Sequence, residues 1–293
     1  MNPQIRRVAF LAVLTLIVVS LAWGQEKDSS QPERFQRSFP VKPGSTLRVE
    51  NYKGTIHING TNTNQVVVNV VKKYDGSSDV DRARWMRETN VRFNNESDRV
   101  EVKVEYPNQG WSCWIWCNES HDNYTAWVEL EIQVPRQANL NVNGYKPDIR
   151  ISSLQGDVRI ESYKAPMSIE STTGAIYIDT YKDSITIRNA AVRGDLHVKS
   201  YKADVVIDAT KLGSSAELSN EKGSIVLRVP ANTGMDVDFD GSRRSSFHTD
   251  FPLTANSGYF DHSVRGTVNQ GGTRVRLRTE RGSIRLEKLN GAL

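Results

Sequence analysis

A side-chain pattern that returns about every nine residues between Gly144 and Leu227 restricts the fold more than any other feature of this 293-residue chain. Pairs of apolar residues stand two positions apart, and successive pairs follow at nine or eleven residues. Examples are Ile149/Ile151, Val158/Ile160 and Met167/Ile169. A spacing of two places both side chains on one face of a β-strand. The pattern therefore predicts short strands separated by turns, with two strands in each unit of about 18 to 20 residues.

Tyrosine followed by lysine returns at the same interval as two of these strands. The four pairs are Tyr145-Lys146, Tyr163-Lys164, Tyr181-Lys182 and Tyr201-Lys202, spaced by 18, 18 and 20 residues. In a β-solenoid each strand stacks in parallel on its equivalent in the next coil, about 4.8 Å away. A hairpin meander gives no reason for such a recurrence. We therefore predict an all-β fold, a parallel β-solenoid or β-helix with about 18–20 residues per coil, in which Tyr-Lys marks one corner.

The extent of the pattern divides the chain into segments. They are a signal peptide (1–24), a flexible linker (25–43), an N-terminal β region (44–143), the regular coils (144–230) and a C-terminal closing segment of the same solenoid (231–293). Within the N-terminal region, residues 79–87 are predicted to form a short helix. Apolar pairs resume at Val275/Leu277 and Ile284/Leu286. This predicts a terminal coil that caps the stack and shields its edge.

The first 24 residues have the layout of a signal peptide. Arg6 and Arg7 precede an apolar run, and Ala22 and Gly24 are small residues of the kind that signal peptidase requires. An uncleaved N-terminal anchor is the alternative, because the run is close to the length that spans a bilayer. No other segment is of this kind, so a multi-pass membrane protein is not expected. Both interpretations place the rest of the chain outside the cytoplasm, in the periplasm, on the cell surface or released.

The charge balance argues against nucleic acid as a partner. The chain has 38 Lys and Arg residues and 34 Asp and Glu residues. Loss of Arg6 and Arg7 with the signal peptide leaves 36 basic residues against 34 acidic ones, a net charge of +2. Affinity for phosphate needs a clustered excess of positive charge, and no run of Lys or Arg is present.

The segment "WSCWIWC" contains both cysteines, Cys113 and Cys117. In an exported chain such a close pair predicts a local disulfide. With His121 it would also offer three metal ligands, but a fourth at zinc-site spacing is not apparent. Three tryptophans accompany the cysteines: Trp111, Trp114 and Trp116. They are predicted to cap an open edge of the solenoid or to form a hydrophobic tip for a protein partner or a membrane surface.

The sequence contains no recognisable catalytic or metal-binding motif. It lacks His-Glu-x-x-His, Gly-x-Ser-x-Gly and a phosphate-binding Gly-Lys-Ser/Thr loop. It also lacks the Gly-Gly-x-Gly-x-Asp turns of calcium-binding β-rolls. Glu161 and Asp179, with Arg159 and Lys199, are the candidates for a polysaccharide lyase or hydrolase site, but acidic residues also alternate outward on any soluble strand. We expect no enzyme activity, no cofactor and no metal.

The Tyr-Lys pairs are the best candidates for a ligand site. Aromatic faces pack on sugar rings, and a line of lysines attracts an anionic polymer such as an acidic polysaccharide, or a lipid headgroup. The alternative is a corner that recurs only because it packs well.

Several longer segments of the chain also form a recognisable set. They are "LRVENYKGTIHING", "EIQVPRQANLNVN", "VPANTGMDVDFD", "SSFHTDFPLT" and "GGTRVRLRTERGSIRLEKL". Over about residues 40–290 the sequence resembles the bacterial putative-adhesin family, an exported β-helix-like domain of unknown function. The resemblance implies an envelope location, an adhesion role and no catalytic residues. The resulting hypothesis is an exported, adhesin-like binding or structural module that recognises a glycan or envelope polymer. The alternatives are a carbohydrate-active β-helix enzyme and a scaffold or sensor for envelope stress.

Overall fold

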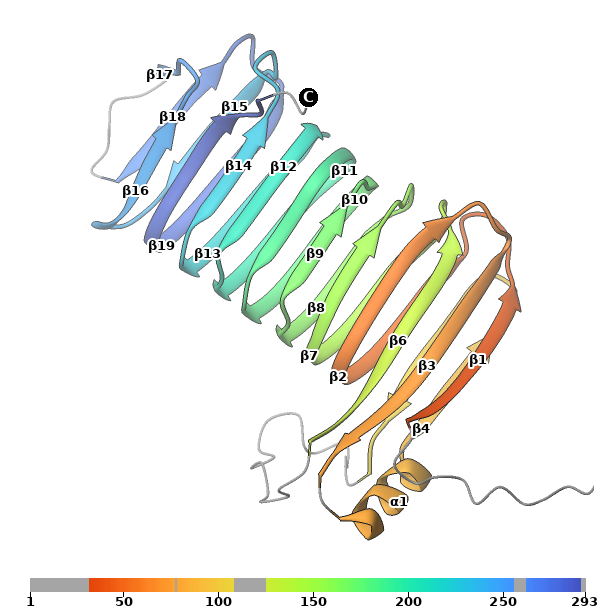
Figure 1. The fold of residues 1–293 in the computed structure, drawn as a ribbon. Helices are drawn as coiled ribbons and strands as arrows, with labels where there is room; N and C mark the ends of the chain where they lie inside the picture. The colour runs from red at the N-terminus through yellow and green to blue at the C-terminus, as the bar shows by residue number, and fades with distance from the viewer. Residues whose placement is uncertain (1–31, 77, 108–124, 256–261, 291–293) are drawn as a thin grey trace, which may run out of the picture.

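The computed structural model describes residues 32–76, 78–107, 125–255 and 262–290. It shows a long, flattened stack of strands with the N-terminal elements at one end and the C-terminal elements at the other (Figure 1). The 19 strands of these residues form one hydrogen-bonded network, accompanied by one helix. The all-β class predicted from the sequence is therefore confirmed.

The middle of the stack consists of repeated coils that pair in parallel. Its strands are β7 (Asn139–Ser152), β8 (Val158–Lys164), β9 (Met167–Glu170), β10 (Thr173–Lys182), β11 (Ile185–Lys202), β12 (Val205–Lys211), β13 (Ser215–Lys222) and β14 (Ile225–Val229). Ile176 lies opposite Val158 on one side and Leu196 on the other. In the other strand of the coil, Ile187 lies between Ile169 and Ile207. Equivalent residues are thus 18 or 20 positions apart.

The core of the stack consists of the alternating apolar residues that mark the strands. Ile160, Ile169, Ile178 and Ile187 are fully buried. Neighbouring residues in the same strands point outward, so each strand has one apolar and one polar face. Burial of these stacked aliphatic columns drives the coils together.

The N-terminal end of the stack is built from residues that are distant in sequence. β2 (Thr46–Thr61) pairs in parallel with β7, although an excursion of the chain, residues 62–138, separates the two strands in the sequence. This excursion contains β3 (Gln65–Asp75), α1 (Asp79–Glu88), β4 (Asn90–Asn95), β5 (Arg99–Glu105) and β6 (Thr125–Pro135). β5 and β6 pair with the other side of β2, so the excursion covers the end of the stack. The helix predicted at 79–87 is confirmed as α1.

Part of the predicted flexible linker is a strand, which corrects the boundary at residue 43. β1 (Glu33–Pro40) pairs antiparallel with β3 along its whole length. Phe35 and Phe39 are half-buried against the core and contact Phe93 at ring-centroid distances of 6.4 and 5.6 Å. These contacts hold β1 at the edge of the N-terminal region.

The C-terminal strand is not the terminal coil that the sequence pattern predicts. β19 (Thr273–Lys288) pairs in parallel with β13 and β14 on one side and with β15 (Met235–Asp240) and β16 (Arg244–Thr249) on the other. β18 (Ser263–Val268) pairs antiparallel with β15, and β17 (Thr254–Ala255) pairs with β18. The last strand of the chain is therefore an inner strand, and β15, β16, β17 and β18 cover the end of the stack (Figure 1).

Several predicted features lie outside the described residues. They are the signal peptide at 1–24 and the segment with Trp111, Cys113, Trp114, Trp116, Cys117 and His121. In the part of the chain that the structure describes, no helix has the length and apolar character needed to cross a membrane.

Candidate functional site

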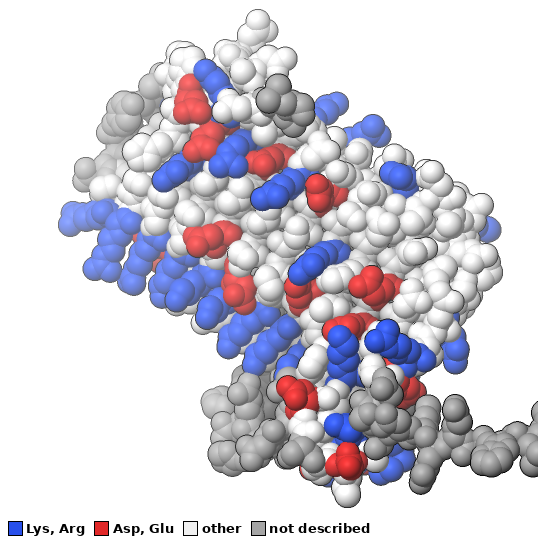
Figure 2. All heavy atoms as spheres, in the orientation of Figure 1, with Lys and Arg blue, Asp and Glu red and all other residues white. Residues whose placement is uncertain are grey.

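At one corner of the stack, basic residues from successive coils lie in register. Lys53 lies opposite Lys146, and Lys182 lies between Lys164 and Lys202. The basic column, as we call it, consists of Lys53, Lys146, Lys164, Lys182, Lys202, Lys222, Arg281 and Arg244. Figure 2 shows basic side chains in a row along one edge of the molecule. The column thus runs along the whole stack.

The tyrosines that precede five of these lysines form a continuous stack of rings. The tyrosine ladder consists of Tyr52, Tyr145, Tyr163, Tyr181 and Tyr201. Neighbouring ring centroids are 4.6, 4.9, 4.8 and 4.8 Å apart, with interplanar angles between 4° and 12°. The separation matches the spacing of paired strands, so the backbone register sets the ring spacing.

This geometry changes how the ladder can bind a ligand. Each face of Tyr145, Tyr163 and Tyr181 is covered by the next tyrosine ring. A sugar ring therefore cannot stack on these faces, contrary to the contact expected from the sequence. Tyr52 and Tyr181 are 37% and 41% exposed, and the other three rings are half-buried, so a ligand meets the ladder at its ring edges and hydroxyl groups. The corner offers a row of phenol hydroxyls beside a row of ammonium groups.

The two rows are held together by contacts between lysines and tyrosines. Lys146 and Lys164 place Nζ 5.4 and 5.1 Å from the ring centroids of the preceding tyrosines. Lys222 lies across the last ring of the ladder, with Nζ 4.8 Å from the Tyr201 centroid and 3.0 Å from its hydroxyl oxygen. Such cation–π contacts fix the ammonium groups close to the hydroxyl row.

A buried polar cluster supports the ladder at its N-terminal end. Asn51 is fully buried, and its Nδ2 donates a hydrogen bond of 3.0 Å to the Val128 carbonyl. The Tyr106 hydroxyl oxygen lies 2.7 Å from both Asn51 Oδ1 and the Lys53 carbonyl oxygen. Burial raises the pKa of Tyr106 well above its usual range, so the phenol stays protonated and donates to this cluster. The corner that begins at Tyr52 is thereby fixed from the inside.

The like charges of the basic column contrast with the alternating charges elsewhere on the stack. Arg228 contacts Asp208 and Glu287 in neighbouring coils, at 3.1 and 2.9 Å. Within the described ranges, Lys164, Lys182, Lys202, Lys222, Arg281 and Arg244 form no ion pair with a carboxylate. Stacked like charges destabilise a sheet. A column that packs well for stability alone would alternate in sign.

Replacing Lys182 by glutamine is expected to stabilise the fold slightly. Lys182 stands between two other lysines, so removing its charge should raise the free energy of unfolding by roughly 0.5 kcal/mol at low salt. Urea unfolding measures this change, and the gain should vanish in 1 M salt because the charges are then screened. Lys211→Gln, outside the column, is the control and should have no comparable effect. A loss of stability in Lys182→Gln would show that the column is not under repulsive strain.

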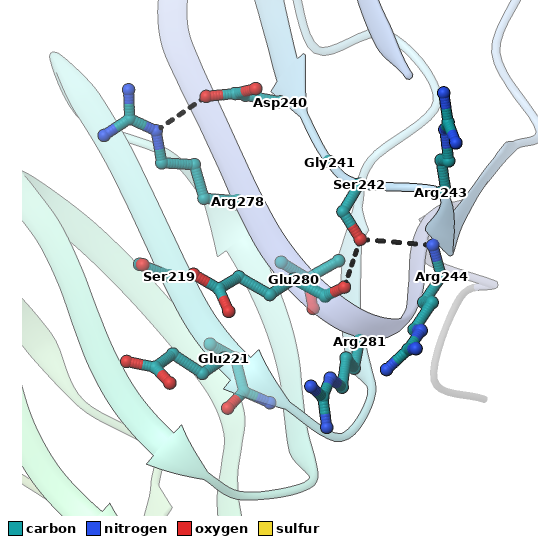
Figure 3. Close-up of a pocket in the computed structure, with 12 residues that line it drawn as sticks. Ser219, Glu221, Asp240, Gly241, Ser242, Arg243, Arg244, Arg278, Glu280 and Arg281 are labelled. Atoms are coloured by element: carbon teal, nitrogen blue, oxygen red, sulfur yellow. Dashed lines mark hydrogen bonds and ion pairs between the residues drawn. The ribbon is translucent and has the colours of Figure 1, made fainter. Parts of the chain in front are cut away.

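An open pocket of about 890 Å³ lies at the C-terminal end of the basic column (Figure 3). Arg244 and Arg281 lie side by side in paired strands at one end of it. Arg278 and Asp240 form an ion pair of 3.3 Å at the other. Glu221 and Glu280 also line the pocket, so it carries both signs of charge.

The structure brings together all eight Tyr and Lys residues predicted as a ligand site. It adds Tyr52 and Lys53 to the four predicted pairs, and it extends the column by Lys222, Arg281 and Arg244. A sequence signal for the extension exists, because "NEKG" at 220–223 matches "NYKG" at 51–54 except for Glu in place of Tyr. Asn220 also repeats the buried role of Asn51, donating to the Ala203 carbonyl at 2.6 Å.

The alternative site with carboxylates has a simpler arrangement. Glu161 lies opposite Asp179 in the next coil, as the spacing predicts. Arg159 donates to Glu161 at 2.6 Å and also lies 4.0 Å from the Tyr177 ring centroid. Among the described residues, no group of three or more His, Cys, Asp or Glu side chains is placed to hold a metal ion.

The stack and its corner define an all-β repeat protein of the solenoid-like class. The chain belongs to the Toastrack DUF4097 family, whose model matches residues 33–287. The resemblance to a putative-adhesin family that the sequence carries is thereby confirmed. No curated protein matches the chain.

Similar solved structures are described as adhesins. A putative cell adhesion protein from Clostridium sporogenes is 10% identical over 88% of this chain and 100% of that chain, with a TM-score of 0.38. A putative adhesin from Bacteroides fragilis is 11% identical over 89% and 99%, with a TM-score of 0.37. A putative adhesin from Parabacteroides distasonis is 9% identical over 89% and 98%, with a TM-score of 0.34.

Proposed function

We propose that this protein is an exported, non-enzymatic adhesin-like module that binds a glycan or another envelope polymer along its tyrosine–lysine corner. The observation that carries the proposal is the register of the corner, which repeats one hydroxyl and one ammonium group in five successive coils. A polymer with a regular repeat meets the same pair of groups at each step.

The rigidity of the corner supports a binding role. The tyrosine rings are fixed by their neighbours and by the strand register, so little side-chain freedom is lost when a ligand binds. Ring stacking leaves the ring edges and the hydroxyl groups as the parts of the tyrosines that a ligand can reach, and only the hydroxyl groups are polar. The proposed recognition is therefore by hydrogen bonds and charge.

Export from the cytoplasm is part of the proposal and rests on the first 24 residues. Export directed by Arg6, Arg7 and the apolar run would bring the corner into contact with envelope polymers. Fractionation of cells that express the full-length chain tests this part. Recovery of the chain only from the cytoplasm would contradict it.

Changing Tyr145, Tyr163, Tyr181 and Tyr201 together to phenylalanine tests the binding role. These changes remove four hydroxyl groups and keep the stacked rings, so the fold should persist while affinity falls by about tenfold or more. Binding of the full chain to envelope fractions and to a panel of acidic and neutral polysaccharides is the measurement. Circular dichroism and thermal unfolding serve as the fold control.

A second variant separates packing from recognition. The same four tyrosines changed to serine lose the ring contacts as well, and each stacked pair contributes about 0.5–1.5 kcal/mol. We therefore expect lower stability in the serine variant and near-normal stability in the phenylalanine variant. Equal binding by the wild type and the phenylalanine variant, or no binding by either, would show that the ladder has only a structural role.

A further inference from the structure

We infer that the ligand of this corner is a single linear acidic polysaccharide, which lies lengthwise on the tyrosine side of the basic column and directs carboxylates toward its lysines over five coils. The inference rests on the proposed function, since it specifies the polymer, its direction and the length that the corner reads. It is based on the tyrosine ladder, the lysines beside it and the acidic residues on either side of them.

The spacing of the corner suits a chain with one charge on each sugar. Adjacent tyrosine rings are 4.6–4.9 Å apart, and each is followed by a lysine in the same register. A uronic acid polymer carries one carboxylate per sugar, and its extended chain advances by a similar distance at each residue. Five coils span about 19 Å, as four steps of about 4.8 Å. Successive sugars of such a chain are rotated about its axis, so only some of the carboxylates face the protein. Each carboxylate that faces the corner meets an ammonium group and a phenol hydroxyl.

Acidic residues on both sides restrict the site to a narrow line. Glu50, Glu161 and Asp179 stand two residues before a tyrosine of the ladder, and Asp148, Asp183 and Asp204 stand one or two residues after a lysine of the column. Glu50, Asp148 and Glu161 are paired with Lys103, Arg150 and Arg159 at 3.6, 2.9 and 2.6 Å. A broad anionic surface, such as a bilayer, therefore meets mixed charges beside the column and gains little from them. A single chain over the tyrosine hydroxyls avoids them. The corner therefore favours a thin polymer.

Two glutamates end the favourable stretch at its C-terminal side. Lys222 and Arg281 lie opposite each other in paired strands, but Glu221 and Glu280 precede them where tyrosines precede the other lysines. Both glutamates line the pocket at this end (Figure 3). Their charges offset those of Lys222 and Arg281, so a carboxylate gains little beyond Lys202. The tyrosine ladder therefore sets the length of the footprint.

A series of oligogalacturonates of two to ten sugars tests the footprint by isothermal titration calorimetry. We expect affinity to rise by about two- to fivefold for each added sugar up to about five, and then to level off. The same oligomers with every carboxyl methyl-esterified are the matched neutral probe and should bind at least tenfold more weakly. Raised salt should weaken binding of the charged series.

Charge-neutralising variants with a matched control locate the site. Lys164→Gln, Lys182→Gln and Lys202→Gln together should lower affinity by about ten- to hundredfold. The control combines Arg188→Gln, Arg193→Gln and Lys211→Gln, which removes three positive charges that are not part of the basic column and should change affinity by less than threefold. Thermal unfolding of both variants confirms that they fold.

A variant with a longer binding site gives the most direct test. Glu221→Gln with Glu280→Gln leaves Lys222 and Arg281 without the opposing charges. We expect the affinity of this variant to rise up to about seven sugars before it levels off. Longer oligomers should bind to it about fivefold or more tightly than they bind to the wild type. An unchanged plateau at five would overturn the role given to the two glutamates.

The outcomes separate failure of this inference from failure of the proposed function. Equal binding of the esterified oligomers, a plateau at two or three sugars, or equal losses in the two lysine and arginine variants would overturn the inference and leave glycan binding intact. Tighter binding of single-stranded DNA or of phosphatidylglycerol vesicles than of any uronate would assign the corner to another class of ligand. Failure of every charged and neutral saccharide to bind would overturn both.

Discussion

Removal of residues 270–293, and with them β19, is expected to lower the free energy of unfolding by more than about 6 kcal/mol. Val275, Leu277, Ile284 and Leu286 are fully buried between two coils. Each such side chain contributes roughly 1.5–3 kcal/mol, so the four together approach the net stability of a whole domain. Because β19 is an inner strand, β15 and β16 lose their partner in the stack as well.

Hydrogen exchange and urea unfolding measure this effect. Amides of residues 235–240 should lose protection in the truncated chain, whereas amides of β8 and β10 in the middle of the stack should retain more of theirs. A chain that ends at Asn290 keeps β19 and is the control. Unchanged protection at 235–240 would mean that β15 packs on the stack without β19, and that the last strand is a terminal coil after all.

The regular coils are predictable from sequence because their pattern is local. Alternation in pairs such as Val158/Ile160 specifies which face of a strand is buried, and the interval of 18 or 20 residues specifies which strands stack. The corner follows from the same interval, since Tyr163 and Tyr181 must align if the strands before them align. One periodic rule therefore accounts for both the core and the candidate site.

The ends of the stack are not predictable by this rule. β2 has the pattern of a coil, but the partner on which it packs, β7, follows only after residues 62–138. Likewise the pattern of β19 identifies a coil without saying that β15 and β16 pack outside it. Pairing between strands that are distant in sequence depends on the conformation of the intervening chain, and local periodicity contains no information about that.

The details of the candidate site divide in the same way. The lysine register follows from the repeat, but the parallel, face-to-face stacking of the rings depends on side-chain rotamers that the spacing does not determine. The Tyr-Lys repeat does not identify Lys222 and Arg281, because Glu221 and Glu280 replace the tyrosine that marks the other corners. The residues of β1 are mostly exposed, so its sequence lacks the alternation that would identify a core strand.

Replacing Gly223 by alanine is expected to cost about 3 kcal/mol of stability, because two separate constraints require glycine there. Gly223 follows Lys222 at the corner and has a φ of +113°, which strains any residue with a side chain. A Cβ at this position would also lie 2.1 Å from the Ala203 carbonyl oxygen in the neighbouring coil. Relief of that contact requires the paired strands to separate, which weakens the ladder on both sides.

Two comparisons separate the close contact from the backbone conformation. Asp183 occupies the equivalent corner position with a φ of +99°, so the conformation alone is compatible with the fold. Gly44 has a φ of +84° and no atom within 4 Å of the position that a Cβ would take, so Gly44→Ala should cost only about 1 kcal/mol. Urea unfolding of the two alanine variants gives the difference. Equal losses of stability in the two variants would show that the coils tolerate a methyl group at the corner. Close approach of the backbones would then not be what fixes the position of Lys222 in the basic column.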